Sequence, residues 1–445
     1  MLKDKILNKK IVILGGGFRS LLTAAYYSKY TKNITIISKD EKNFHGIMSP
    51  IKVFGSNFDK GYQFFDGFSE ENKKFLENLI EEKILHNFGY GASTITNSKI
   101  YPYHGIPYWP HKSKKLALKS FLFILKNFFK KNQINKNIKN YQELLDTICP
   151  DINLIMQKAC LRNTQKKPEE LSHLVSTFSH YLNYRQTLMP DPIAKILKKI
   201  EYFDQRIASR RKSLNMDQIS LYPKGKYIGY VSEIIKKRLL QNGVKFIFSD
   251  IIKIEDKNKL QVDCSGDSIE TDLIFIVTEL DKIEEFFKEK IFKEKSQHYV
   301  SQVFFYFKTD KIFSKFQYVH GNDPDIFINR VSNHSLYGEM TPDNKAVLSA
   351  ECPTPINSEL WNNPEKFLKK IWQEIIMSKQ ANKTQSFTDF KIFNIPKTLA
   401  VPLKNYEENI EKLLSFSRNK YKERIIYPGL GKFSRNIFIN SLRDS

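Results

Sequence analysis

Cysteine is scarce in this chain of 445 residues, and its four cysteines lie far apart. They are Cys149, Cys160, Cys264 and Cys352, with no Cys-x-x-Cys pair and no histidine cluster beside them. This spacing argues against a zinc site and against a disulfide framework. The sequence also lacks a Gly-Lys-Ser/Thr phosphate loop and a Gly-x-Ser-x-Gly elbow. We therefore predict no metal site and neither a P-loop enzyme nor a serine hydrolase of the elbow type.

Long apolar runs are also absent. The first ten residues are rich in charge, and the apolar run that follows them ends at Leu14, which is too short for a signal peptide. No stretch approaches the roughly 20 apolar residues that a transmembrane helix needs. We therefore expect a cytoplasmic protein.

Acidic residues are outnumbered by basic ones, and the formal net charge is +23. Such a charge is typical of proteins that bind nucleic acids or anionic membranes. Here the lysines are scattered instead of gathered in one stripe, which favours a diffuse solvated surface that attracts anionic substrates. We therefore predict an anionic small-molecule substrate and no nucleic-acid partner.

Residues 114–139 alternate Phe, Leu and Ile clusters with lysine, which predicts one or two basic amphipathic helices. Three interpretations fit this pattern: a helix packed on the core, a helix on a membrane surface, and a nucleic-acid contact. We favour the first, because a core helix needs the same apolar face. Weak peripheral membrane contact through this segment remains the second interpretation.

A β-α-β unit is predicted near the N-terminus. The apolar run Ile11–Leu14 leads into Gly15-Gly16-Gly17-Phe18-Arg19-Ser20, a helical pattern follows, and a second apolar run ends at Ser38. Gly15 permits the tight turn, Gly17 lets the backbone approach a pyrophosphate, and the helix start offers unpaired N–H groups to phosphates. Ser20 replaces the third glycine and is small enough for close helix packing. The alternative is a glycine turn of another α/β protein without a nucleotide.

The end of the second strand departs from the usual dinucleotide pattern. An acid there normally binds the ribose hydroxyls, and Ser38 stands at that position. Either Asp40 or Glu41 reaches back, or the Ser38 hydroxyl substitutes for the acid, or the site is weakened.

The middle and end of the chain predict further strands of two kinds. Residues 271–278 form a nearly continuous apolar run, as a buried parallel strand requires. Residues 300–307, 326–330 and 346–351 predict an antiparallel sheet instead. Arg330 ends one of these strands, where it would clamp a carboxylate or a diphosphate, or form a surface ion pair.

Two other segments are candidates for a substrate pocket. Residues 88–110 are rich in Gly, Tyr, Pro and His and predict a loop with short strands. His104 and His111 are more typical of structural histidines than of catalytic ones. Residues 141–212 are helical by periodicity except at 189–192. Their spacing places Tyr181, Tyr184 and Arg185 on one helical face, which would point into a cleft or pack in the core.

Four short motifs together resemble one flavoprotein superfamily, which contains amine oxidases, protoporphyrinogen oxidase, carotenoid desaturases and UDP-galactopyranose mutase. The motifs are the N-terminal glycine turn, Phe58-Asp59-Lys60-Gly61, Tyr222-Pro223-Lys224-Gly225 and Pro428-Gly429-Leu430-Gly431. The resemblance implies FAD as cofactor. It implies FAD contacts at Gly15, Gly17, Phe18, Ser20, Ser38, Gly46, Val244, Gly429 and Gly431.

The resemblance also implies an α/β fold with two interleaved domains. A Rossmann-like FAD-binding domain with a parallel sheet would comprise residues 1–68, 218–285 and 420–445. An α+β substrate domain with an antiparallel sheet would comprise residues 69–217 and 286–419.

Three functions follow from this resemblance. The first is a FAD-dependent oxidoreductase in which the flavin accepts hydride from a small or glycan-related substrate, with Gln63, Tyr184, Arg185 and Arg330 as catalytic candidates. The second is a non-redox flavoenzyme acting on a nucleotide sugar; mutases carry a histidine in place of Gln63 and an arginine in place of Leu430. The third is a nucleotide-binding protein without turnover.

Overall fold

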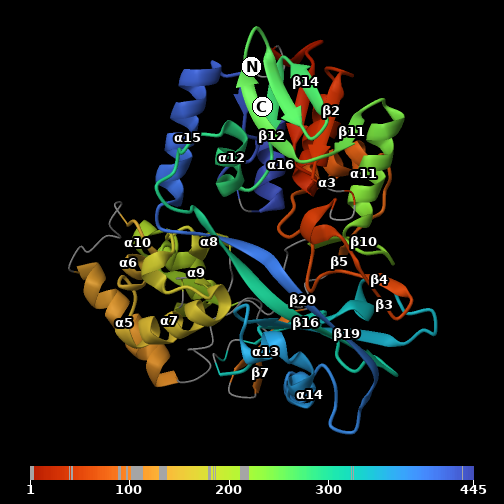
Figure 1. Ribbon diagram of the computed structural model, residues 1–445. Coiled ribbons are helices and arrows are strands. Elements are labelled where there is room, and N and C mark those ends of the chain that lie inside the picture. The colour runs from red at the N-terminus through yellow and green to blue at the C-terminus, as the bar shows by residue number, and fades with distance from the viewer. Residues whose placement is uncertain are drawn as a thin grey trace.

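The computed structural model describes most of the chain. The described residues are 5–39, 41, 44–88, 92–96, 99–101, 114–129, 138–178, 182–183, 185, 187–210, 220–321, 323, 325–432 and 434–444. The chain folds around two large sheets, one parallel and one mainly antiparallel, which form the upper and lower parts of Figure 1.

The parallel sheet has five strands in the order β11-β2-β1-β15-β21. Their bounds are Lys245–Phe248, Ile34–Ser38, Ile11–Leu14, Leu273–Ile276 and Ile425–Ile426. β1 and β15 are buried along their whole length, because elements pack on both faces of the sheet. This burial explains their uninterrupted apolar sequences, and the predicted Rossmann-like α/β fold is confirmed.

Four helices cover one face of the parallel sheet and share its largest core cluster. They are α2 (Phe18–Tyr27), α3 (Glu70–Ile80), α11 (Tyr230–Gln241) and α16 (Arg435–Arg443). The other face is covered by a three-stranded antiparallel sheet and two helices. These are β12 (Ile251–Asp256), β13 (Leu260–Cys264), β14 (Asp267–Thr271), α12 (Leu280–Phe287) and α15 (Tyr406–Tyr421). We call the parallel sheet with these elements the parallel-sheet unit.

The second sheet has seven strands in the order β20-β16-β19-β18-β17-β6-β7. Their bounds are Phe387–Pro402, Gln297–Thr309, Ala346–Pro353, Arg330–Asn333, Tyr318–Gly321, Ala92–Thr96 and Lys99–Tyr101. Adjacent strands are antiparallel except β17 and β6, which are parallel. Residues from α13 (Glu359–Asn362) and α14 (Leu368–Met377) pack against one face of this sheet. The other face is turned toward the parallel-sheet unit.

A group of helices lies beside the seven-stranded sheet (Figure 1). They are α5 (Lys114–Phe129), α6 (Tyr141–Leu145), α7 (Pro150–Thr164), α8 (Val175–Phe178), α9 (Asp191–Leu197) and α10 (Glu201–Asp204). The prediction of helix through 141–212 is wrong at several places: residues 165–167 and 171–174 lie outside helices, and β8 (Thr187–Pro190) and β9 (Ile207–Arg210) pair as parallel strands. Tertiary pairing has overridden local periodicity there.

The helix predicted within residues 114–139 is α5, and it packs on the protein core. Ile124 is buried against Phe203 and Ile207, while Leu118 and Leu122 remain exposed. This packing favours the core interpretation of the segment. Within the described residues, no helix is both long and apolar enough to cross a membrane. Peripheral membrane contact stays a prediction.

Small pairs of strands connect the two large sheets. β3 (Ile51–Val53) and β4 (Ser56–Phe58) form a hairpin, and β5 (Leu85–Phe88) pairs with β10 (Ser220–Pro223). Helices α3 and α15 pack in the cores of the parallel-sheet unit, although we assigned residues 69–80 and 406–419 to the substrate domain. The domain boundaries proposed from the sequence stay a prediction.

Candidate active site

Three adjoining cavities run from the edge of the parallel sheet to the seven-stranded sheet. The Ser38 cavity has a volume of about 220 Å³ and is lined by Gly15, Gly16, Ser38, Asp250, Thr278 and Glu285, among others. The glycine cavity, about 450 Å³, is lined by Gly15, Gly17, Arg19, Thr278, Gly429 and Gly431, among others. The inter-unit cavity, about 430 Å³, is lined by Phe18, Arg19, Tyr62, Gln63, Arg330 and Arg435, among others. Each cavity shares lining residues with the next, so the three are neighbours, and we refer to them together as the cleft.

The N-terminal glycine turn has the conformation that a close approach to a ligand needs. Gly15 has φ +134°, and a Cβ placed on it would lie 2.3 Å from the Val277 carbonyl oxygen. A Cβ on Gly17 would meet no described atom within 4 Å. Gly17 is the N-cap of α2, and no described side chain caps that helix. The first N–H groups of α2 therefore face the glycine cavity, as a phosphate site requires.

Ser20 permits the close contact between α2 and the turn. Its side chain is fully buried, and its hydroxyl oxygen would lie 2.9 Å from a Cβ on Gly15. A second glycine turn, at Gly429 and Gly431, lines the same cavity. Gly429 has φ +68°, and a Cβ there would collide with the Phe438 ring at 2.1 Å. Both turns thus bring bare backbone to the cavity.

Carboxylates missed by the sequence analysis lie beside Ser38. The Ser38 cavity is lined by Asp250 and Glu285, which come from segments far away in the sequence. Glu41 instead forms an ion pair with Lys236 at 3.0 Å, and Asp40 lies outside the described residues. The Ser38 hydroxyl approaches Gly16, since a Cβ on Gly16 would lie 2.1 Å from that oxygen.

Val244 lies at the opposite end of its strand from this cavity. β11 runs parallel to β2 with Phe248 opposite Ser38, so Val244 precedes the amino end of β11. Its N–H donates to the Leu239 carbonyl at 2.9 Å. Ligands of open parallel sheets bind at the carboxyl ends of the strands. Residues 249–251, which follow the carboxyl end of β11, line the Ser38 cavity, and Val244 does not.

Gly46 and Phe18 occupy the junction of the glycine turn and the inter-unit cavity. His45 donates its N–H to the Gly16 carbonyl at 2.7 Å, and Gly46 follows with φ +61°. The next two residues line the inter-unit cavity. Phe18 also lines it and packs on Phe65, with 5.6 Å between ring centroids.

Two arginines face the middle of the cleft, and the sequence analysis assigned neither. Arg19 lines both the glycine cavity and the inter-unit cavity. Burial, together with the nearby charge of Arg435, lowers the pKa of Arg19 to about 10. Arg435 donates to the Phe64 carbonyl at 2.7 Å and to the Gln63 side-chain oxygen at 2.5 Å. Gln63 therefore lines the inter-unit cavity as a partner of Arg435.

The seven-stranded sheet supplies a row of side chains to the inter-unit cavity. Phe304, Glu351, Arg330 and His320 stand directly opposite one another on four neighbouring strands, and all four line the cavity. Alternate residues of these strands, such as Phe305, pack in the core on the other face. The strand period of two thus separates a cavity face from a core face.

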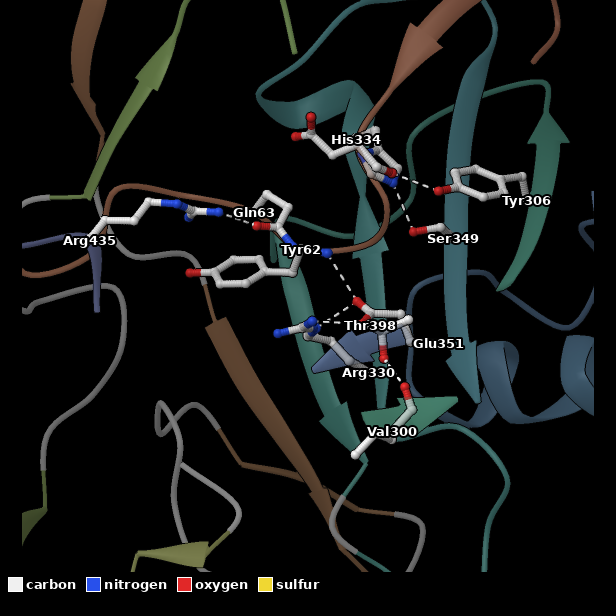
Figure 2. Close-up of polar contacts among 11 residues, drawn as sticks. Tyr62, Gln63, Val300, Tyr306, Arg330, His334, Ser349, Glu351, Thr398 and Arg435 are labelled. Carbon is white, nitrogen blue, oxygen red and sulfur yellow. Dashed lines mark hydrogen bonds and ion pairs between the residues drawn. The ribbon is translucent and has the colours of Figure 1, made fainter. Parts of the chain in front are cut away.

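Arg330 forms a bidentate ion pair with Glu351, through two contacts of 2.6 Å. The Glu351 side chain is only 2% exposed, so the surface ion pair considered for Arg330 is wrong. Glu351 also accepts the Tyr62 N–H at 2.9 Å, and the Arg330 guanidinium lies 5.0 Å from the Tyr62 ring centre. Figure 2 shows Tyr62 between this pair and the Arg435–Gln63 pair.

Of the other two predicted catalytic residues, only Arg185 is described, and it is not brought to the cleft. Arg185 donates its Nε hydrogen to the Asp204 carbonyl at 2.8 Å and is not among the described residues that line the cavities. It also lies outside any helix, contrary to the predicted helical face. Tyr181, Tyr184, His104 and His111 fall outside the described residues.

Asp59 links the second and third motifs to each other. Its buried carboxylate accepts the Tyr222 hydroxyl at 2.5 Å and the Ile228 N–H at 2.9 Å. Its backbone carbonyl accepts the Tyr306 hydroxyl at 2.6 Å. Burial raises the pKa of Asp59 to about 7, against the effect of its hydrogen bonds. Through these contacts Asp59 ties the segment after β4 to β10, to the start of α11 and to the seven-stranded sheet.

Comparison with known proteins gives matches only at the level of structure. No protein-family model and no curated protein matches the chain. A UDP-galactopyranose mutase in its reduced form matches 98% of this chain and 92% of its own, with a TM-score of 0.72 and 15% identity. A putative protoporphyrinogen oxidase from Exiguobacterium sp. 255-15 matches 98% of this chain and 99% of its own, with a TM-score of 0.67 and 14% identity.

A third similar structure is a putrescine oxidase bound to putrescine. It matches 98% of this chain and 97% of its own, with a TM-score of 0.61 and 10% identity. At these identities the likeness establishes the fold, and it spans nearly the full length of both chains in each case. The chain therefore has the fold of the FAD-dependent amine-oxidase-like flavoproteins, the superfamily that its sequence motifs resemble.

Proposed function

We propose that this protein is a FAD-dependent oxidoreductase that acts on a small polar substrate in the inter-unit cavity. The observation that carries the proposal is the series of three neighbouring cavities, which are lined in turn by Ser38, by both glycine turns and by the row of side chains on the seven-stranded sheet. A long dinucleotide needs such an extended site, with phosphate-binding backbone in its middle.

The residues present fit FAD along this cleft. The uncapped start of α2 and the bare backbone at Gly17 would hold the pyrophosphate, with Arg19 as a neighbouring cation. Ser38 and Asp250 would bind the ribose hydroxyls. Bound FAD would supply hydride acceptance at its ring, while the protein supplies orientation and a dry pocket. Tyr62 and the Arg330–Glu351 pair would then position the substrate.

A second candidate is a non-redox flavoenzyme that rearranges a nucleotide sugar. The fold similarity to UDP-galactopyranose mutase supports it. Gln63 and Leu430 count against it, because mutases carry a histidine and an arginine at these positions. The basic composition of the chain fits an anionic substrate for either candidate.

Anaerobic reduction of the FAD-loaded protein tests this proposal. Alcohols, amines and sugars would be added separately, and the visible flavin absorption would be followed. An oxidoreductase bleaches the flavin when its substrate is added. A mutase-like enzyme turns over its substrate only after reduction with dithionite. FAD binding without either reaction would leave a nucleotide-binding protein without turnover.

A further inference from the structure

The inter-unit cavity holds two amide side chains with unused hydrogen-bonding atoms. Asn163, near the end of α7, and Gln302, on β16, both line the cavity. They are only 5% and 6% exposed. The Asn163 Nδ2 and the Gln302 Oε1 have no hydrogen-bond partner among the described residues. Buried polar atoms normally have partners, so a ligand is expected to supply them.

Asn163 is held rigidly over the sheet. Its neighbour Gln165 donates to the Ser301 carbonyl at 2.8 Å, which ties the end of α7 to β16. On the other side, Arg162 donates to the Gly321 carbonyl at 2.6 Å, at the end of β17. These contacts fix the end of α7 between two strands that contribute to the cavity.

Gln302 belongs to the cavity face of the sheet. It lies two residues before Phe304 on β16, so both side chains point to the same side. Phe304 stands opposite Glu351, whose charge is balanced by Arg330 at 2.6 Å. This cavity therefore offers one hydrogen-bond donor and one acceptor beside a neutralised ion pair.

We propose that Asn163 and Gln302 bind a hydroxyl-bearing part of the substrate, such as a sugar ring. A hydroxyl group donates one hydrogen bond and accepts others, so hydroxyl groups can satisfy both the Asn163 donor and the Gln302 acceptor. A protonated amine cannot accept from Asn163, and an alkyl group would leave both amides unpaired at a cost. This inference rests on the proposed function, because it names the substrate class of the same cavity.

Sugar binding to matched variants tests the inference. The probes are methyl galactoside, methyl glucoside and their single-deoxy analogues, with cyclohexylamine as an apolar amine. Binding is measured by calorimetry on the protein before and after FAD loading. The variants are Gln302→Met and Asn163→Asp, which keep the side-chain size but remove the acceptor and the donor. Gln261→Leu, on β13 away from the cleft, is the control.

We expect one glycoside to bind the wild-type protein and the control variant with equal affinity. It should bind each cavity variant about tenfold more weakly. One deoxy analogue should bind the wild-type protein about tenfold more weakly than the parent glycoside does. Gln302→Met should bind this analogue and the parent glycoside with equal affinity, because the acceptor for the missing hydroxyl is already gone. Thermal unfolding checks that the variants are folded. Preference for cyclohexylamine, or equal sugar binding by all variants, would overturn the inference. Failure to take up FAD would instead contradict the proposed function.

Discussion

At the residue scale, Asp59 shows how burial converts one carboxyl into a pH-dependent contact. An aspartate in the unfolded chain ionises near pH 3.8, whereas burial raises the pKa of Asp59 to about 7 in the folded protein. The folded state therefore binds the proton more tightly. Below pH 3.8 Asp59 is protonated in both states, and above about pH 7 it is ionised in both. Between these values the free energy of unfolding falls as the pH rises, because ionising the buried carboxyl of the folded protein costs free energy.

Replacement of Asp59 by asparagine should remove that pH dependence. The amide oxygen still accepts from Ile228, and the Tyr222 hydroxyl can turn to accept from the amide nitrogen. Between pH 4 and 7, the free energy of unfolding of the wild type, relative to Asp59→Asn, should fall by a few kcal/mol. The expected slope approaches about 1.4 kcal/mol per pH unit, the free energy of one proton bound by the folded state alone. Denaturant titrations at several pH values measure this difference. Parallel curves for the two proteins would show that Asp59 does not titrate in this range.

Arg19 is predicted to favour cofactor binding at some expense to the empty protein. Its charge is buried near Arg435, so Arg19→Gln should relieve repulsion and leave the FAD-free protein at least as stable. The same change should weaken FAD binding about tenfold or more, because a buried charged hydrogen-bond donor is lost. Fluorescence titration with FAD and thermal unfolding measure the two effects.

Arg443→Gln is the matched control for Arg19. Arg443 lies on α16 and pairs with Glu71 at the surface, away from the cleft. The Arg443→Gln variant should therefore bind FAD with the affinity of the wild type. A loss of stability in Arg19→Gln with unchanged FAD affinity would assign Arg19 a structural role only.

At the element scale, the turn after β4 depends on a glycine beneath the Arg330–Glu351 pair. Gly61 has φ +70°, and a Cβ there would lie 2.2 Å from a Glu351 carboxylate oxygen. Gly67 has a similar φ of +64°, but a Cβ there would meet no described atom within 4 Å. The two glycines thus share backbone conformation and differ in available space.

Alanine at these two positions should separate backbone strain from steric collision. Gly67→Ala should cost about 1 kcal/mol of unfolding free energy, from the left-handed conformation alone. Gly61→Ala should cost about 2 to 4 kcal/mol, because Glu351 must also move. Urea unfolding of both variants measures the comparison. Equal costs would mean that Glu351 does not hold the position described here.

Local sequence patterns predicted the elements whose causes are local. The β-α-β unit followed from the apolar run, the glycines and the small Ser20, and each has the expected structural role. The strands β8 and β9 were missed, since their pairing depends on the fold and not on periodicity. Val244 was proposed from motif spacing, and the direction of β11 places it at the wrong end of the strand for the cavity.

At the scale of the whole molecule, the candidate site is assembled from distant parts of the chain. Arg19 and Arg435 meet in one cavity although they lie near opposite ends of the sequence. Asp250 reaches Ser38 through the pairing of β11 with β2. Gln302 and Asn163 line one cavity because α7 is tied to the seven-stranded sheet. Such juxtapositions follow from topology, which a single sequence without aligned relatives does not specify.

The central claim is that the cleft between the two sheets binds FAD with its pyrophosphate at Gly17. The most direct test is the visible spectrum of the protein after FAD addition and desalting, for the wild type and for Gly17→Val. Gly17 has an ordinary extended backbone and open space at its Cβ, so the variant should fold in the FAD-free state, with only the small loss of thermal stability that valine causes at a helix N-cap. We predict retained flavin absorption in the wild type and its loss in the variant. A wild type without flavin absorption, or a variant that retains FAD equally well, would contradict the account.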